Sequence, residues 1–95
     1  PNTPAQMIPG QELSEIIKQN GSPLVVLAMH KFEVSDDKQV RFLSLPSNPQ
    51  QYAQSIYSML RYADSLRPQS ILIEQPPQDE EWAAVRDRLQ RACAR

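Results

Sequence analysis

The sequence predicts an α/β fold: a three-layer αβα sandwich in which helices cover both faces of a mainly parallel sheet of about four strands. Two short runs, residues 24–29 and 71–73, are continuously apolar, which is typical of strands buried on both faces. Segments with apolar residues at helical spacing separate most of the predicted strands. The prolines mark the ends of elements and form no proline-rich tract. These observations predict the order β-α-β-β-α-β-α.

The chain is organised around its last strand and helix. Residues 71–73 form the strand, which ends before Pro76 and Pro77 because neither proline can donate a ladder hydrogen bond. Asp79 is the predicted cap of a helix over residues 79–94, with acidic residues in its first turn. One face of that helix is apolar and consists of Trp82, Val85, Leu89, Ala92 and Cys93.

The first part of the chain predicts a strand, a helix and a second strand. Residues 5–8 form a short strand, and residues 11–20 form a helix that Asn20 and Gly21 end. The run 24–29 carries the strongest strand signal, so we expect it in the centre of the sheet.

The middle of the chain predicts a half-exposed strand and a long helix. Residues 40–45 alternate in polarity, which favours a position near an edge of the sheet. The connection from 24–29 has no room for a helix, so it is a hairpin or a crossing loop; the strand direction stays open. Asn48 and Pro49 are the predicted cap and first residue of the next helix. Its apolar face consists of Tyr52, Ala53, Ile56, Met59, Leu60 and Ala63.

Composition limits the classes of function. With 95 residues the chain forms one domain, and no stretch approaches the roughly 20 apolar residues that span a membrane. The net charge of −1 provides no overall field that attracts nucleic acid. No signal peptide is visible, and a single cysteine is compatible with a reducing cytosol, so we expect a cytoplasmic protein. The first residue is Pro1 and not Met, which indicates a domain of a longer parent.

The sequence from residue 45 onward also resembles a known family. The residues that carry the resemblance are Leu45-Pro46-Ser47-Asn48-Pro49, Tyr52-Ala53, Ile56-Tyr57, Leu60-Arg61, Ala63-Asp64, Ile71-Leu72-Ile73-Glu74, Pro76-Pro77, Glu81-Trp82-Ala83-Ala84-Val85, Asp87-Arg88-Leu89 and Arg91-Ala92. Together they are similar to the C-terminal domain of the long, two-domain form of threonylcarbamoyl-AMP synthase, in the Sua-five/YciO/YrdC family. Residues 1–27 fit the same domain through a Thr-Pro segment, a helix and an apolar strand.

The resemblance implies a Rossmann-like accessory domain over residues 5–95, preceded by the end of an interdomain linker at residues 1–4. In this family the parent is a nucleotidyltransferase that makes threonylcarbamoyl-AMP from threonine, bicarbonate and ATP, for tRNA threonylcarbamoyladenosine modification and hence translation. The chemistry belongs to an N-terminal YrdC-like domain that is absent from this chain. No catalytic residue carries over, and we expect this domain alone to have no enzyme activity.

The resemblance also implies partners and cofactors. The expected partner is the YrdC-like catalytic domain of the same parent chain, on which this domain docks and which it helps to close. Other proteins of tRNA threonylcarbamoyl transfer are further expected partners, whereas direct tRNA binding and a membrane are not expected. The domain needs no cofactor of its own, and ATP is a substrate of the parent. The alternative is an independent small-ligand or nucleotide-binding module of Rossmann-like form.

One loop is the candidate docking or ligand site. Glu74, Gln75, Pro76 and Pro77 follow a buried strand, at the edge where α/β sheets hold ligands. His30 ends the central strand at the same edge, but catalysis needs an acidic or nucleophilic partner that spacing does not identify. The competing interpretation is a turn set by prolines that only directs the last helix.

The other candidates have simpler structural interpretations. Gly10 could open a weak anion site at a helix start, but the favoured interpretation is a turn glycine. Cys93 fits a small buried hydrophobe, and residues 36–37 fit a turn. One histidine and one cysteine make no metal-ligand set. Arg61 and Arg67 fit a solvated face better than an RNA interface.

Overall fold

The computed structural model describes residues 2–19, 21–30 and 39–93. The strands in these residues are β1 (Ala5–Ile8), β2 (Leu24–Ala28), β3 (Val40–Ser44) and β4 (Ser70–Glu74), and the helices are α1 (Gly10–Gln19), α2 (Pro49–Ser65), a 3-10 helix (Glu80–Trp82) and α3 (Ala83–Cys93). The strands form one sheet in the order β1-β4-β2-β3, and every neighbouring pair is parallel. The element order is the predicted one.

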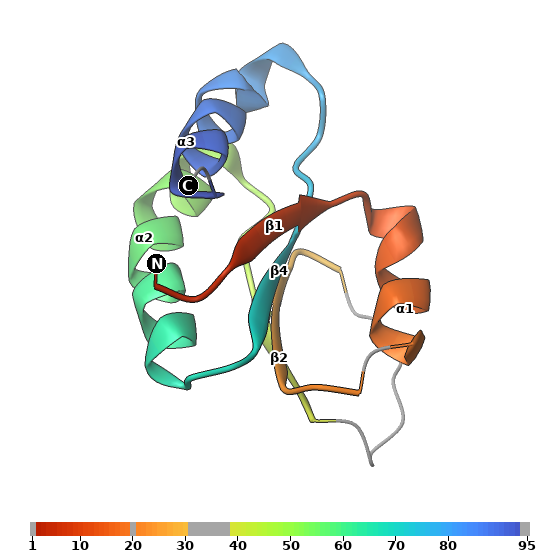
Figure 1. Cartoon of the computed structure of the whole chain (residues 1–95). Coiled ribbons are helices and arrows are strands. Elements are labelled where there is room, and N and C mark those ends of the chain that lie inside the picture. Colours follow the sequence, from red (N-terminus) through yellow and green to blue (C-terminus); the bar gives the residue numbers. More distant parts are fainter. Residues whose placement is uncertain (1, 20, 31–38, 94–95) are drawn as a thin grey trace.

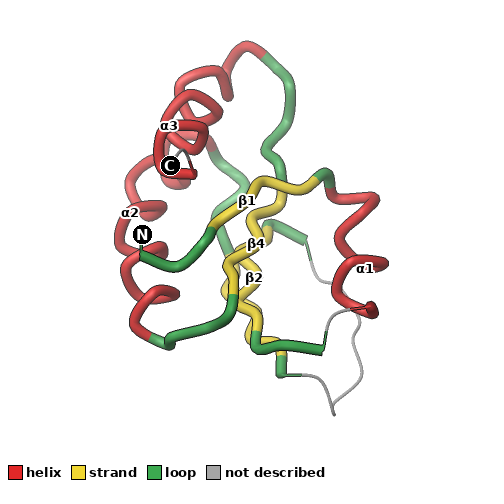
Figure 2. Tube along the Cα trace, in the orientation of Figure 1, coloured by secondary structure: helices red, strands yellow, loops and turns green. Residues whose placement is uncertain are grey.

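Helices cover both faces of this sheet, which confirms the three-layer αβα sandwich (Figures 1 and 2). Helix α1 covers one face, and α2 and α3 cover the other. Strand β2 alternates between them: Val25 and Leu27 face α2 and α3, whereas Leu24, Val26 and Ala28 face α1. All five residues of β2 are buried, which explains why its sequence has no polar alternation.

The structure resolves the direction of the third strand, which the sequence left open. Strand β3 runs parallel to β2, with Leu24 beside Val40 and Ala28 beside Ser44. The hairpin alternative was therefore wrong, because a hairpin would make the two strands antiparallel. Strand β3 lies at an edge and is half-exposed, as its alternating pattern predicted.

The start of the long helix is as predicted, but the start of the last helix is not. The Asn48 side chain accepts hydrogen bonds from the backbone N–H groups of the first turn of α2, and Pro49 is its first residue. Asp79 makes no such side-chain bond, and the chain passes through a 3-10 turn before α3 begins. The Asp79 carbonyl accepts from Trp82 N and from Arg86 Nη1, so its backbone and not its carboxylate bonds to the start of this helical segment.

The second residue after α2 has a left-handed backbone. Arg67 has a φ of 53°, and its N–H donates to the Asp64 carbonyl at 3.1 Å. A residue in this conformation commonly ends a helix, and glycine is the usual choice because it carries no Cβ. The chain turns there and enters β4. The start of β4 lies next to the segment that precedes β1, and Ile71 N donates to Pro4 O (Figure 1).

Candidate functional site

The carboxyl ends of the strands form the edge at which α/β sheets usually hold ligands. Neighbouring strands β1 and β4 are followed by helices on opposite faces of the sheet, α1 after β1 and α3 after β4 (Figure 1). This arrangement is a topological switch point. An open depression of about 380 Å³ lies there, and its lining is Pro9, Gly10, Gln11, Gln75, Pro76, Pro77 and Gln78. Three of the predicted loop residues thus line one depression.

Glu74 is the buried charged residue of this region, with 5% of its surface exposed. Its Oε1 accepts hydrogen bonds from Met29 N at 2.8 Å and His30 N at 3.1 Å, and its Oε2 lies 2.6 Å from His30 Nδ1. The carboxylate therefore joins the end of β4 to the end of β2. The structure supplies the acidic partner for His30 that spacing could not identify, because the two residues are 44 positions apart.

The His30–Glu74 pair has the components of a general base but not its setting. A carboxylate that orients an imidazole is a common catalytic arrangement. The His30 side chain, however, is 73% exposed and lies outside the set of residues that line the depression. The pair therefore holds two strand ends together, and the geometry assigns it no reaction.

Glu74 also occupies the space next to the start of α1. A Cβ built on Gly10, the first residue of that helix, would lie 3.3 Å from Glu74 Oε2. Helix N-termini attract negative charge, and nucleotide-binding α/β domains place a phosphate there. In this chain a carboxylate of the domain itself lies beside that position. A bound phosphate would meet the charge of Glu74, so the geometry disfavours the anion site considered for Gly10.

A buried tyrosine, Tyr52, lies in the core near the loop after β4. The sequence identified it only as a core residue. Tyr52 is fully buried, and its ring contacts Trp82 edge to face, with centroids 5.4 Å apart. Its hydroxyl has no hydrogen-bond partner among the described residues, and burial raises the pKa of Tyr52 well above its ordinary value. In the loop after β4, Pro76 is buried, while Gln75 and Pro77 are exposed. The loop therefore has a rigid apolar base and a polar rim.

A second carboxylate, Asp64, organises the opposite end of the sheet. Its Oδ1 accepts from Thr3 Oγ1 at 2.5 Å and from Thr3 N at 2.9 Å, and its Oδ2 accepts from Asn2 N at 3.2 Å. The Thr3 hydroxyl, followed by the Asn2 N–H, lowers the pKa of Asp64 below its ordinary value. Pro4 O accepts from Ile71 N at 2.8 Å. The sequence predicted an extended linker here but gave no sign that α2 fixes it.

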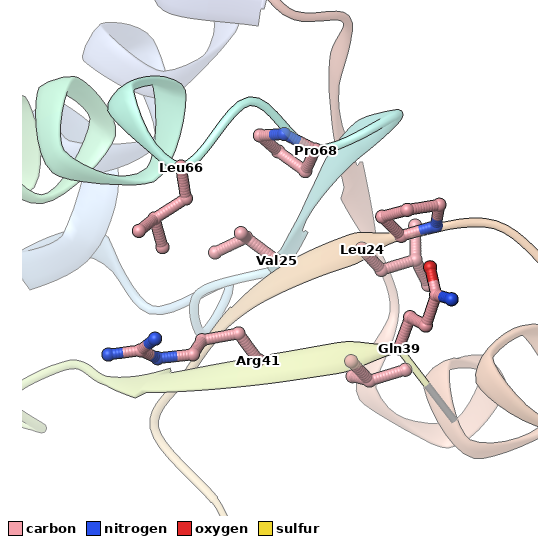
Figure 3. A pocket seen from close by; sticks show the side chains of 8 residues that line it. Leu24, Val25, Gln39, Arg41, Leu66 and Pro68 are labelled. Atoms are coloured by element: carbon pink, nitrogen blue, oxygen red, sulfur yellow. The ribbon is translucent and has the colours of Figure 1, made fainter. Parts of the chain in front are cut away.

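A groove of about 340 Å³ lies beside the same end of α2 (Figure 3). Its lining is Pro23, Leu24, Val25, Gln39, Val40, Arg41, Leu66 and Pro68. Arg41 extends along one side of it, while Leu66 and Pro68 point toward it from the chain after α2 (Figure 3). Arg41 Nη2 donates to the Tyr62 hydroxyl at 3.1 Å. The groove thus combines an apolar lining with one cationic side.

The other predicted candidates are not brought into these regions. Arg61 and Arg67 are exposed, Cys93 is half-buried, and residues 36–37 lie outside the described residues. Burial raises the pKa of the Cys93 thiol, which fits the small hydrophobe expected from the sequence. Among the described residues, no three His, Cys, Asp or Glu side chains form a group that could hold a metal ion.

Comparisons with known proteins give one match. The family model described as "Threonylcarbamoyl-AMP synthase, C-terminal domain" matches residues 1–94. Searches of the curated proteins and of the solved structures gave no match. The helices in the described part of the chain all fall short of the length and apolar content that crossing a membrane requires. Because the family model covers nearly the whole sequence, this chain belongs to the family of threonylcarbamoyl-AMP synthase C-terminal domains.

Proposed function

We propose that this domain is a non-catalytic accessory domain that docks on the YrdC-like catalytic domain of its parent synthase and helps to close it. The match to a synthase C-terminal domain over residues 1–94 carries the proposal. The geometry supports it, because the Glu74 carboxylate lies beside the start of α1, where a nucleotide phosphate would otherwise bind. The domain therefore acts through the surfaces that it offers to another protein.

In this proposal the reaction takes place outside these 95 residues. The catalytic domain joins threonine, bicarbonate and ATP into threonylcarbamoyl-AMP, which serves the threonylcarbamoyladenosine modification of tRNA in the cytoplasm. This domain contributes no catalytic residue and binds no cofactor. Its first partner is the catalytic domain of the same polypeptide, and proteins that transfer the threonylcarbamoyl group are further partners.

The test compares the two-domain synthase with a version that lacks this domain. We expect removal to lower kcat/KM for threonylcarbamoyl-AMP formation, and we expect addition of residues 1–95 as a separate chain to restore part of it. The separate chain should consume no ATP by itself. Unchanged kcat/KM after removal, together with no binding between the two pieces, would contradict the proposal.

The second candidate is an independent small-ligand or nucleotide-binding module. The depression at the switch point favours it, because ligands of α/β domains bind in that position. Calorimetric titration of the chain with ATP, threonine and threonylcarbamoyl-AMP separates the two candidates. Saturable binding that the Gln78→Trp variant abolishes, through a bulky side chain at the rim, would establish the second candidate; absence of heat for all three ligands would exclude it for these compounds.

A further inference from the structure

We propose that the C-terminal end of α2 is the face that this domain turns toward the preceding catalytic domain, and that Asp64 anchors the connecting segment to it. The inference rests on the proposed function, because it identifies the surface through which the accessory domain docks. Three observations carry it: the anchored segment, the exposed side chains on α2 and after it, and the contrast with the opposite end of the sheet.

The anchored segment fixes the point at which the polypeptide reaches this domain. Asp64 accepts three hydrogen bonds from Asn2 and Thr3, and β4 holds the next residue through Ile71 N and Pro4 O. Residues 2–4 therefore follow one path against α2 and β4. Any domain that precedes Asn2 in the polypeptide is tethered beside the end of α2, at a high effective concentration for contacts with that face.

Exposed apolar side chains of the kind expected at a protein interface lie on α2 and directly after it. Those near its end face β3, at the sheet edge opposite to the β1 edge that Asp64 anchors. The large apolar side chains with the greatest exposure among the described residues are Tyr57, Tyr62 and Leu66, all on α2 or at its end. Leu66 lines the groove, and Tyr62 accepts the hydrogen bond of Arg41, which lines it as well. Tyrosine and arginine are enriched at interfaces, and the groove suits an apolar side chain with a neighbouring carboxylate.

The opposite end of the sheet offers less for a protein partner. Glu74 and Pro76 are buried there, and the carboxylate is engaged by His30 and Met29. The exposed rim of the depression includes the amides Gln11, Gln75 and Gln78. Among the described residues, Tyr62 and Leu66 are large exposed apolar residues at the α2 end, and Tyr57 lies in the middle of α2, so a catalytic domain gains more apolar contact on the α2 side.

The test measures interdomain distances in the intact two-domain synthase by pulsed electron paramagnetic resonance. One label occupies the catalytic domain and the other replaces Glu15 on the exposed side of α1, after Cys93→Ser removes the native thiol. We expect Asp64→Ala and Leu66→Glu each to broaden the distance distribution. Thr3→Val should broaden it less than Asp64→Ala and add nothing to that variant, because both remove the same anchor.

Two controls keep the test specific. Asp87→Asn alters another exposed carboxylate, which pairs with Arg91 at 3.1 Å on α3, and should leave the distribution unchanged. Gln78→Glu places a charge at the opposite end and should also leave it unchanged. Hydrogen exchange of the β2 amides in the same samples shows that each variant domain is folded.

The outcomes separate this inference from the proposed function. If Asp64→Ala and Leu66→Glu leave the distances unchanged while Gln78→Glu broadens them, the loop after β4 is the docking face and the inference is wrong. If Asp64→Ala, Leu66→Glu, Thr3→Val and Gln78→Glu all leave a narrow distribution unchanged, the α2 end is not the interface either. If removal of the whole domain leaves kcat/KM unchanged, and the separate domain does not bind the catalytic domain, the proposed function itself fails.

Discussion

The two carboxylates at opposite ends of the sheet make similar contacts in different settings. Glu74 and Asp64 each engage two backbone N–H groups and one side chain of a distant segment. Glu74 is buried and joins two strands of the sheet. Asp64 is partly exposed and joins α2 to the segment that precedes β1. One carboxylate therefore belongs to the core, and the other holds a segment at the surface.

The difference shows how burial decides what a carboxylate does. A buried carboxylate cannot lose a partner without leaving polar groups unpaired. Glu74 is therefore expected to keep its contacts with Met29 and His30 as long as the domain is folded. An exposed carboxylate exchanges its partners for water at little cost, so the contacts of Asp64 can hold a segment and still release it. The substitutions below test this contrast, from the largest expected effect to the smallest.

Glu74→Ala should have the largest effect on stability. It leaves Met29 N and His30 N without their acceptor and opens space in a buried position, so we expect a loss of about 3 kcal/mol in the free energy of unfolding. Glu74→Gln keeps one oxygen in place, and we expect a loss of about 1 kcal/mol. Urea unfolding followed by circular dichroism measures both. A loss below about 1 kcal/mol for Glu74→Ala would show that the carboxylate is not a core group.

Gly10→Ala tests how tightly Glu74 is held. The new Cβ would lie 3.3 Å from Glu74 Oε2, and a carboxylate with three partners cannot move away freely. We expect a loss of about 1 kcal/mol despite the better helix propensity of alanine. Gly21→Ala is the matched control, because nothing lies within 4 Å of its Cβ. Equal effects of the two substitutions on urea unfolding would show that Glu74 gives way.

Arg67→Gly should stabilise the Asp64 end. Arg67 has a φ of 53°, a conformation that glycine adopts without the steric cost of a Cβ. We expect a gain of about 0.5–1 kcal/mol in the free energy of unfolding, measured by urea titration. The control Ser65→Gly places glycine at the last residue of α2 and should reduce stability by a similar amount. A loss for Arg67→Gly would mean that the arginine makes contacts worth more than its backbone strain.

The Asp64 contacts should depend on pH. Thr3 and Asn2 hold the pKa of Asp64 below its ordinary value of 3.8, so the ionised form favours the folded state. Their stabilisation is present above the ordinary value and is lost as the pH falls through the lowered one. Nuclear magnetic resonance of the Thr3 amide measures this loss, and Asp64→Asn should remove the transition. If the resonance of the Thr3 amide did not change as the pH was lowered from 5 to 2, the Thr3 N–H would not be bonded to a carboxylate that titrates in that range. That result would contradict the anchor.

The sequence was sufficient to predict the layers of the fold but not the contacts across them. Continuous apolar runs identified β2 and β4, and Asn48 with Pro49 identified the start of α2, because these signals are local. The parallel direction of β3 and the missing cap at Asp79 depend on how distant segments meet. The same holds for the site, where His30 and Glu74 were named separately but their contact was not predicted. The contact of Asp64 with Thr3 had no sequence signal, since 61 residues separate them.

The strand order has a consequence for how this domain forms. Strand β4 is the last strand in the chain, yet it lies between β1 and β2 and pairs with both. During synthesis, β1 has no hydrogen-bonded neighbour in the described sheet until residue 74 has left the ribosome. Such distant pairings slow folding, so the nascent chain holds an incomplete sheet with a gap at its centre until that last strand inserts.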